Sequence, residues 1–317
     1  MGVFRDIKKN KGGVLALAPM EGVTDTVFRQ VLCEIGRPDL FFTEFLNVEG
    51  FCSKGREKVL HRLRFRDIEQ PVVIQLWGNI PEYYARTIEY VKTLKPAGID
   101  INMGCSVRDV LSGGRGSALI NDRVLAKEIV DSVKESAREI PVSVKTRIGF
   151  DHVMTEDWIG FLLEQNLDMI TVHGRLSREG YSTPSKWKEI GKVVKLRDEI
   201  SPNTVILGNG DLKNLKQANA HIKKYGVDGV MIGRAILNNP WLFVNREPYS
   251  ISKEERIQTL KKHLEIFEKE KGDMGIFSSQ KKYIKAYINN FDGANELRSK
   301  LMCAEDSLEV LNILNNL

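Results

Sequence analysis

The chain has 317 residues, of which 42% are hydrophobic and 28% charged, and its formal net charge is +5. This composition is typical of a globular protein, and the length suits one large barrel or two ordinary domains. No apolar run approaches the ~18 residues of a membrane-spanning helix, so we expect no membrane association. The mild positive charge permits a nucleic-acid partner without requiring one. The apolar run 14–18 follows a basic N-terminus but soon meets Glu21, so it is interpreted as a first strand rather than a signal peptide.

Short apolar runs alternate with amphipathic stretches along the first 240 residues. The expected strands are 14–18, 40–44, 71–76, 98–102, 142–147, 169–173, 204–209 and 229–233. The expected helices are 24–36, 81–95, 122–138, 155–166, 185–199 and 213–225. The strands are apolar throughout rather than alternating, which indicates burial on both faces, as in a parallel sheet. The pattern predicts an α/β fold, a (β/α)8 TIM barrel. A doubly wound sheet is the alternative, but no GxGxxG follows the first strand.

From about residue 240 onward the pattern changes to helix alone. The stretches 253–271, 276–290, 294–302 and 304–316 carry helical periodicity and no strand signal. We therefore expect residues 1–240 to form the barrel and residues 241–317 to form a smaller all-helical C-terminal domain. The chain is expected to act as a monomer.

Four cysteines, Cys33, Cys52, Cys105 and Cys303, lie far apart, without a CxxC pair or a cysteine–histidine cluster at metal-ligand spacing. We therefore expect no metal site, and the cysteine usage suits the reducing cytoplasm. Cys105 stands out because it closely follows the expected strand 98–102 and precedes a glycine-rich segment. From its position alone it could be a buried thiol, a metal ligand, a nucleophile or a proton donor.

Polar and glycine residues recur where the expected strands end, and barrels of this kind carry their chemistry at those carboxyl ends. GNGD (208–211) and IGR (232–234) follow the seventh and eighth strands. Glycines there let a phosphate approach the backbone closely, and Arg234 adds a fixed cation. The alternative is that Gly210 and Gly233 only form turns.

Four further side chains at strand ends are candidates for binding a ligand. Lys145 interrupts an apolar strand, so it has either an ion-pair partner at the rim or a role as a cation aimed at a cofactor that gains negative charge. The amides of Gln75 and Asn102 are suited to orient a flat heterocycle. His173, in the sequence His-Gly-Arg, is either a hydrogen-bonded core histidine or part of the site.

Taken in series, the strand-end motifs resemble those of the tRNA-dihydrouridine synthases in order and spacing. They are APMEGVTD, TEF, QLWG, INMGC, SVKTRIG, HGR followed by GY and W, GNGD and VMIGRA. The resemblance covers residues 14–245, and the helical remainder is compatible with it. It implies a barrel that binds FMN and a helical domain that helps to hold tRNA. The implied reaction is reduction of the C5–C6 double bond of uridine, with NADPH or NADH as reductant.

The resemblance also assigns roles to matching positions. The residues implied along the FMN ring are Pro19, Met20 and Glu21, with Gln75 and Lys145 bonded to the isoalloxazine. Lys145 would stabilise the anionic reduced flavin, and His173 would flank both flavin and substrate. The residues implied at the FMN phosphate are Asn209, Gly210, Asp211, Gly233 and Arg234. The residues implied at the substrate are Asn102, beside the uracil, and Arg175 and Arg178 at the mouth.

Under this resemblance Cys105 is the catalytic acid. Hydride transfer to C6 of uracil moves charge towards C5 and O4, and C5 must then be protonated. A thiol with a pKa of about 8.5 is mostly protonated at neutral pH and still acidic enough to donate. We expect residues 104–120 to form a mobile, glycine-rich loop that carries this acid. Ser106 stands where the family usually has proline, so we expect the loop to be less rigid there.

Two basic segments are expected to contact RNA phosphates. Residues 54–66 carry Lys54, Arg56, Lys58, Arg62, Arg64 and Arg66 against Glu57 alone. Residues 280–287 place Lys281, Lys282 and Lys285 within about one helical turn, with Tyr283 and Tyr287 available for packing or stacking. For both segments a solvated helix face is the alternative.

Two other functions stay open at this point. A flavin-containing barrel could act on a small-molecule pyrimidine, as a dihydroorotate-type dehydrogenase does, although a basic mouth and a helical tail fit that poorly. A barrel that binds RNA without catalysis would lack flavin. The sequence also leaves open whether the RNA is tRNA or ribosomal RNA and which uridine is reduced, with Glu21 suggesting position 16 of the D-loop.

Overall fold

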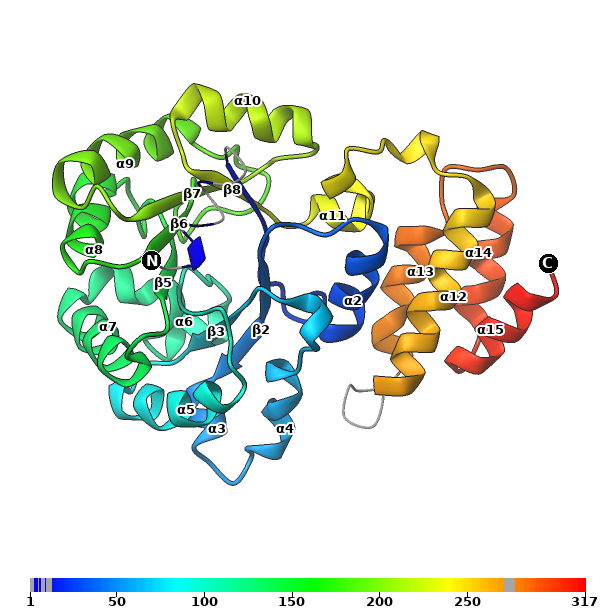
Figure 1. Ribbon diagram of the computed structural model, residues 1–317, viewed down its shortest axis with the longest axis horizontal. Coiled ribbons are helices and arrows are strands. Elements are labelled where there is room, and N and C mark those ends of the chain that lie inside the picture. Colours follow the sequence, from blue (N-terminus) through cyan, green and yellow to red (C-terminus); the bar gives the residue numbers. More distant parts are fainter. Residues whose placement is uncertain (1–2, 5, 7–8, 10–12, 271–276) are drawn as a thin grey trace.

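All eight expected strands are present in the computed structural model, which describes residues 3–4, 6, 9, 13–270 and 277–317. The strands are β1 (Val14–Leu17), β2 (Phe41–Asn47), β3 (Val72–Trp77), β4 (Gly98–Met103), β5 (Val142–Arg147), β6 (Met169–His173), β7 (Val205–Asn209) and β8 (Gly229–Ile232). They form one parallel sheet in the order β1-β8-β7-β6-β5-β4-β3-β2. A parallel bridge from Ala16 to Leu40 joins its two edges into the ring of strands in Figure 1. The predicted (β/α)8 barrel is confirmed.

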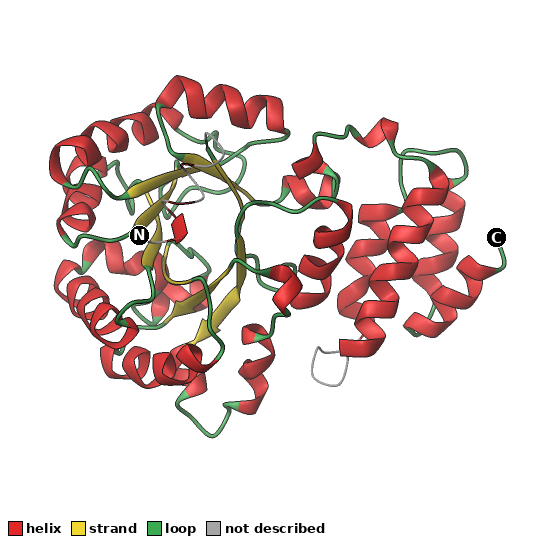
Figure 2. Ribbon diagram, in the orientation of Figure 1, coloured by secondary structure: helices red, strands yellow, loops and turns green. Residues whose placement is uncertain are grey.

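Helices cover the outside of this ring, as Figure 2 shows. The longer ones are α2 (Thr26–Ile35), α5 (Pro81–Thr93), α7 (Arg123–Ala137), α9 (Trp187–Ile200) and α10 (Leu215–Tyr225). The side chains of Asp25, Asp122 and Asn214 cap α2, α7 and α10 by accepting a backbone N–H of the first turn. Within the expected helix 155–166, a π-helical turn, Thr155–Ile159, precedes the short α8 (Gly160–Glu164). The short helices α3 (Val48–Phe51), α4 (Glu57–Leu60) and α6 (Arg108–Ser112) lie outside the expected helical ranges.

Two apolar layers hold the barrel together. One cluster includes Val73, Leu207 and Met231 of the strands together with Phe4 from the N-terminal segment. Phe4 packs closely on Gly98, where a Cβ would lie 2.7 Å from its Cζ. The larger cluster extends over the strands and helices and into the C-terminal helices. Because Phe4 packs on the first residue of β4, it lies at the amino-terminal ends of the strands, opposite their carboxyl ends.

The C-terminal helices form a bundle beside the barrel, close to α2 and α11 (Figure 1). They are α12 (Lys253–Glu270), α13 (Lys281–Tyr287), α14 (Ala294–Cys303) and α15 (Ser307–Asn315), whereas α11 (Ala235–Asn238) precedes them and contacts α13. Phe28 of α2 packs on Tyr283, with ring centroids 5.0 Å apart, and Arg66 donates two 2.8 Å hydrogen bonds to Glu270. The ends of the expected helices at residues 271 and 276 lie outside the described residues.

Candidate active site

The strand ends bring most of the predicted site residues to one mouth of the barrel. The register pairs are Gln75 with Asp100, Asn102 with Lys145, Arg147 with His173, and His173 with Asn209. Paired positions on neighbouring strands lie about 4.8 Å apart. The side chains from β3 to β7 therefore form one continuous polar surface.

A buried carboxyl–amide network occupies one side of the mouth. Gln75 donates through Nε2 to Asp100 Oδ2 at 2.7 Å, and Asn102 Nδ2 donates to Gln75 Oε1 at 3.0 Å. Ser143 donates to Asp100 Oδ1 at 2.5 Å. Burial raises the pKa of Asp100 to about 6, against the hydrogen bonds from Ser143 and Gln75. Asp100 was not among the predicted site residues, although an aspartate inside the apolar run GIDIN was a signal that could have found it.

Cys105 is half-buried, and its backbone is fixed on both sides. Asn102 Oδ1 accepts the N–H groups of Gly104 at 3.1 Å and Cys105 at 2.9 Å. The Cys105 carbonyl accepts the N–H of Ser117 at 2.9 Å and its hydroxyl at 2.8 Å. Gly116 permits this approach, because its φ is +58° and a Cβ there would lie 2.7 Å from the Cys105 oxygen. The segment expected as a mobile loop therefore folds back on Cys105 and contains α6 and a 3₁₀ turn, Gly116–Asn121.

Lys145 is a half-buried cation in the middle of the mouth. Within the described part of the chain, its ammonium makes no hydrogen bond and no ion pair. Its pKa is lowered to about 8, first by burial and then by the nearby Arg147, against the opposing effects of Asp100 and Cys105. The ion-pair alternative from the sequence is thus not what the structure contains. An ammonium held here without such a partner suits a ligand that offers an acceptor or a negative charge.

His173 is buried beside Lys145 and is neutral. Arg175 donates from Nη1 to His173 Nε2 at 3.0 Å, so the imidazole proton lies on Nδ1. Burial lowers the pKa of His173 well below its usual range, and the cationic Lys145 and Arg147 lower it further. A neutral His173 therefore keeps one N–H donor, at Nδ1.

Arg175 and Arg178 differ in their surroundings. Arg175 is 1% exposed, and its guanidinium bonds to His173, to both oxygens of Asp211 at 2.6 Å and to two backbone carbonyls. It therefore orients neighbouring groups. Arg178 is exposed, with its guanidinium carbon 5.4 Å from the centre of the Phe150 ring. The predicted contact of either arginine with the substrate stays a prediction.

The ends of β7 and β8 form the second side of the mouth. Gly210 has a φ of +133°, and a Cβ there would lie 2.2 Å from Ser185 Oγ, so only glycine fits. A Cβ on Gly233 would make ordinary van der Waals contacts with Ala18 and with Met20 Sδ, both at 3.6 Å, so the loop after β1 packs beside this backbone. Arg234 is 55% exposed and lies 3.6 Å from the Asp211 carboxylate. This combination of glycine backbone and cation fits a phosphate.

Two other residues predicted at the phosphate are engaged inside the chain. Burial acts to raise the pKa of Asp211, but hydrogen bonds from Arg175 and from the Ser185 N–H outweigh it and hold that pKa below the usual value. A carboxylate repels a phosphate, so the Asp211 side chain acts through the two arginines that it holds. Asn209 donates to the Met231 carbonyl at 2.8 Å and so ties β7 to β8.

The loop after β1 completes the mouth. Pro19 and Met20 are half-buried, and Met20 Sδ is 3.6 Å from the position of a Cβ on Gly233. Glu21 is exposed and forms an ion pair with Arg62. The next residue, Gly22, donates its N–H to Glu44 Oε1 at 2.6 Å, and its carbonyl accepts a hydrogen bond from Lys282 of α13. The helical part therefore touches the loop that lines the site.

The two basic segments are less available than the sequence suggests. In residues 54–66, Arg56 packs on the Phe51 ring at 4.2 Å, while Arg62 and Arg66 pair with Glu21 and Glu270. In α13, Lys281 donates to the Met302 carbonyl and Lys282 to that of Gly22, whereas Lys285 is exposed. The side chains of Tyr283 and Tyr287 are fully buried, so they pack inside the protein and are not available to stack on an RNA base.

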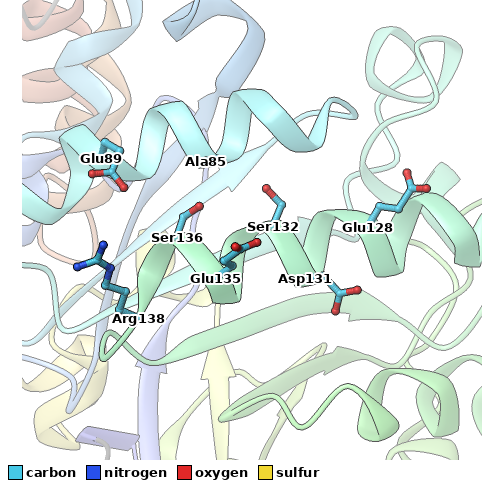
Figure 3. Close-up of a pocket in the computed structure, with 8 residues that line it drawn as sticks. All are labelled: Ala85, Glu89, Glu128, Asp131, Ser132, Glu135, Ser136 and Arg138. Carbon is cyan, nitrogen blue, oxygen red and sulfur yellow. The ribbon is translucent and has the colours of Figure 1, made fainter.

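A further hollow lies away from this mouth, on the outside of the barrel. This groove has a volume of about 630 Å³. Figure 3 shows it between α5 and α7, with a lining that includes Glu89, Glu128, Asp131 and Glu135. It contains none of the predicted site residues. Among the described residues, no group of three or more His, Cys, Asp or Glu side chains could hold a metal ion. Nor does any helix in that part of the chain have the length and apolarity to cross a membrane.

Comparison with known proteins identifies the family. Solved structures with the same fold include morphinone reductase, with a TM-score of 0.51 at 11% identity over 73% of this chain and 84% of that one. A probable tRNA-dihydrouridine synthase of Staphylococcus aureus (strain COL) is 41% identical over 302 residues, 94% of this chain and 91% of the relative. The probable tRNA-dihydrouridine synthase 2 of Bacillus subtilis (strain 168) is 39% identical over 95% and 92% of the two chains. The family model for dihydrouridine synthase matches residues 16–317, and the chain belongs to the dihydrouridine synthase family.

Proposed function

We propose that this protein reduces the C5–C6 double bond of uridine in tRNA, with FMN as cofactor and NADPH or NADH as reductant. The observation that carries the proposal is the Lys145 ammonium, which has no partner among the described residues and lies between the Gln75–Asp100–Asn102 network and neutral His173. This arrangement offers a cation and several hydrogen-bonding groups to a flat, electron-accepting ring. The tRNA-dihydrouridine synthases among its relatives support the choice of substrate.

The two sides of the mouth would hold the two ends of FMN. Lys145 and Gln75 would bind the polar edge of the isoalloxazine, with Pro19, Met20 and Glu21 along the ring. The backbone at Gly210 and Gly233 and the Arg234 cation would bind the phosphate, while Asn209 and Asp211 would keep these groups in place. Bound FMN would supply the hydride that adds to C6 of the uracil.

Cys105 and Asn102 would act on the uracil itself. Asn102 lies directly before the Cys105 segment and bonds to its backbone at 2.9 Å, so a base held by Asn102 would be near the thiol. The Cys105 Sγ–H bond breaks as its proton moves to C5, and the thiolate regains a proton from solvent. Positioned general acids of this kind contribute about 10²–10⁴-fold to rate.

The tRNA would be held across both parts of the chain. The target base must leave its stack to enter the mouth. Residues 241–317, as a helical tRNA-binding domain, and exposed cations such as Arg178 and Lys285 would contact the phosphates around it. Arg175 would support the substrate by orienting His173.

The proposal is tested by the flavin of the purified protein. We expect a yellow protein with one FMN per chain, whose flavin NADPH or NADH reduces anaerobically. Mixing with an unmodified tRNA transcript should then reoxidise the flavin and yield dihydrouridine. A protein that stays colourless after incubation with FMN would overturn the cofactor assignment. Reoxidation by free uracil or orotate, and not by the transcript, would replace tRNA with a small pyrimidine as substrate.

A further inference from the structure

We propose that Arg147 and Ser106 form a clamp that positions the Cys105 thiol. The inference rests on the proposed role of Cys105 as the acid and adds two positioning residues to it. Arg147 is a charged residue at the end of β5 and is only 5% exposed. Burying a guanidinium is costly unless it is paired or hydrogen-bonded.

All three nitrogens of Arg147 donate hydrogen bonds, and two of them reach the residues on either side of Cys105. Nε donates to the Gly104 carbonyl at 2.7 Å, and Nη2 donates to Ser106 Oγ at 3.0 Å. The third, Nη1, donates to the Leu176 carbonyl at 2.8 Å. The planar guanidinium therefore bridges the chain before and after the thiol and anchors both to the loop after β6. The shorter reach and single ammonium of a lysine could not reproduce this geometry.

A second connection joins the same two loops. The hydroxyl of Ser117, which also donates to the Cys105 carbonyl, lies 2.6 Å from the hydroxyl of Ser177. Ser177 follows Leu176 and is held by its own N–H to the Gly149 carbonyl at 3.0 Å. The Cys105 segment is thus tied to the loop after β6, which also carries Arg175.

The clamp explains how this chain manages without a proline after its cysteine. A proline would fix the backbone by its ring. Ser106 leaves the backbone freer, but its hydroxyl provides the acceptor for Nη2 of Arg147, so the restraint comes from a side-chain hydrogen bond instead. The expected loss of rigidity at this position is therefore offset by Arg147.

The clamp can be measured through the thiol itself. Alkylation of Cys105 by iodoacetamide, followed by peptide mass spectrometry, has an internal reference in the exposed Cys303. The variants are Ser106→Ala, which removes the acceptor, and Ser106→Thr, which keeps it. Ser112→Ala is the matched control, because Ser112 is exposed in the same segment and donates to the Asp109 carbonyl instead.

In Ser106→Ala we expect the rate of Cys105 alkylation, relative to that of Cys303, to rise about fivefold. This factor corresponds to the net free energy of one ordinary hydrogen bond. Reoxidation of the flavin by tRNA should slow roughly 10- to 100-fold, as for a misplaced reacting group. FMN content and flavin reduction by NADPH should not change. Ser106→Thr and Ser112→Ala should match the wild type in every measurement. Adding Ser106→Ala to Arg147→Lys should slow reoxidation no further, because both changes break the same contact.

Two results would overturn the clamp: an unchanged alkylation ratio and reoxidation rate in Ser106→Ala, or a Ser106→Thr variant as defective as Ser106→Ala. Failure of the underlying function looks different. If Cys105→Ala reoxidised at the wild-type rate, the acid assignment would fail. The alkylation ratio would still report whether Arg147 and Ser106 restrain the thiol.

Discussion

The barrel mouth and its junction with the helical part both gather charged side chains, and they differ in how one cation of the mouth, Lys145, is held. At the junction the charged side chains have partners: Arg66 pairs with Glu270, and Lys282 donates to the Gly22 carbonyl. At the mouth, Lys145 is half-buried, and the described residues offer it no partner. A paired charge indicates a contact made within the fold, whereas a half-buried charge without a partner indicates a position where a ligand binds.

The largest effect should come from the thiol at the mouth. Replacing Cys105 with alanine should slow flavin reoxidation by tRNA by about 10²–10⁴-fold, the contribution of a general acid. Flavin content and reduction by NADPH should be unaffected, because no proposed flavin contact is lost. Cys303→Ala is the control from the helical part. If Cys303→Ala had the larger effect, the acid would lie in the helical part and not at the barrel mouth.

The next effect concerns the buried carboxyl group of Asp100. Its pKa is about 6 in the folded protein, above the value of ~3.9 for an unfolded chain, so the folded state binds more protons between these values. Its contribution to stability is therefore present below pH ~4 and is lost as pH rises through 6. Compared with Asp100→Asn, the flavin-free wild type should lose up to about 3 kcal/mol of unfolding free energy over that window. The measurement is denaturant unfolding at each pH. If the unfolding free energies of the wild type and of Asp100→Asn changed in parallel with pH, burial would not raise the pKa of Asp100.

Lys145 should produce a smaller effect, on cofactor affinity. Lys145→Met should weaken FMN binding by roughly 10- to 100-fold, as expected for a lost hydrogen bond to a charged group. In the flavin-free wild type the Lys145 ammonium has a pKa of about 8, and a ligand that offers it a hydrogen-bond acceptor favours its charged form. FMN affinity should therefore fall as pH rises through 8, and this fall should be absent in Lys145→Met. The measurement is a fluorescence titration with FMN. Equal affinities and pH profiles for the wild type and Lys145→Met would show that Lys145 does not contact the cofactor.

The smallest effects should separate the lysines of α13. Lys285 is exposed, so Lys285→Ala should lower the salt slope of tRNA binding by about one, for one lost phosphate contact. Lys281 donates to the Met302 carbonyl, so Lys281→Ala should leave the salt slope unchanged. Equal salt slopes for the wild type and both variants would show that neither lysine contacts an RNA phosphate and that this face of α13 is an ordinary solvated surface.

The same contrast explains which features the sequence could predict. Strand ends in a parallel barrel meet at one mouth whatever the side chains are, so the strand pattern alone was enough to group Gln75, Asn102, Lys145 and His173. Helix periodicity does not say which neighbour a face meets. The burial of Tyr283 and the bond from Lys282 to Gly22 depend on α13 docking against the barrel, which no local pattern encodes.

Asp100 and Arg147 show a second limit. Both lie in strands whose apolar neighbours indicate burial, but the sequence alone does not reveal which groups surround a buried charge. Their roles emerge from partners that are distant in the sequence: Ser143 for Asp100, and Ser106 and Leu176 for Arg147. The clamp on Cys105 therefore becomes visible only in the folded chain.

The central claim is that this mouth reduces uridine in tRNA through FMN and Cys105. Dihydrouridine mapping in total RNA from a strain that lacks the gene tests it most directly, with the wild-type gene and the Cys105→Ala variant returned separately. We predict that specific tRNA dihydrouridines disappear in the deletion strain, return with the wild-type gene and stay absent with the variant. An unchanged dihydrouridine profile in a strain with no second enzyme of this family, or full restoration by Cys105→Ala, would contradict the account.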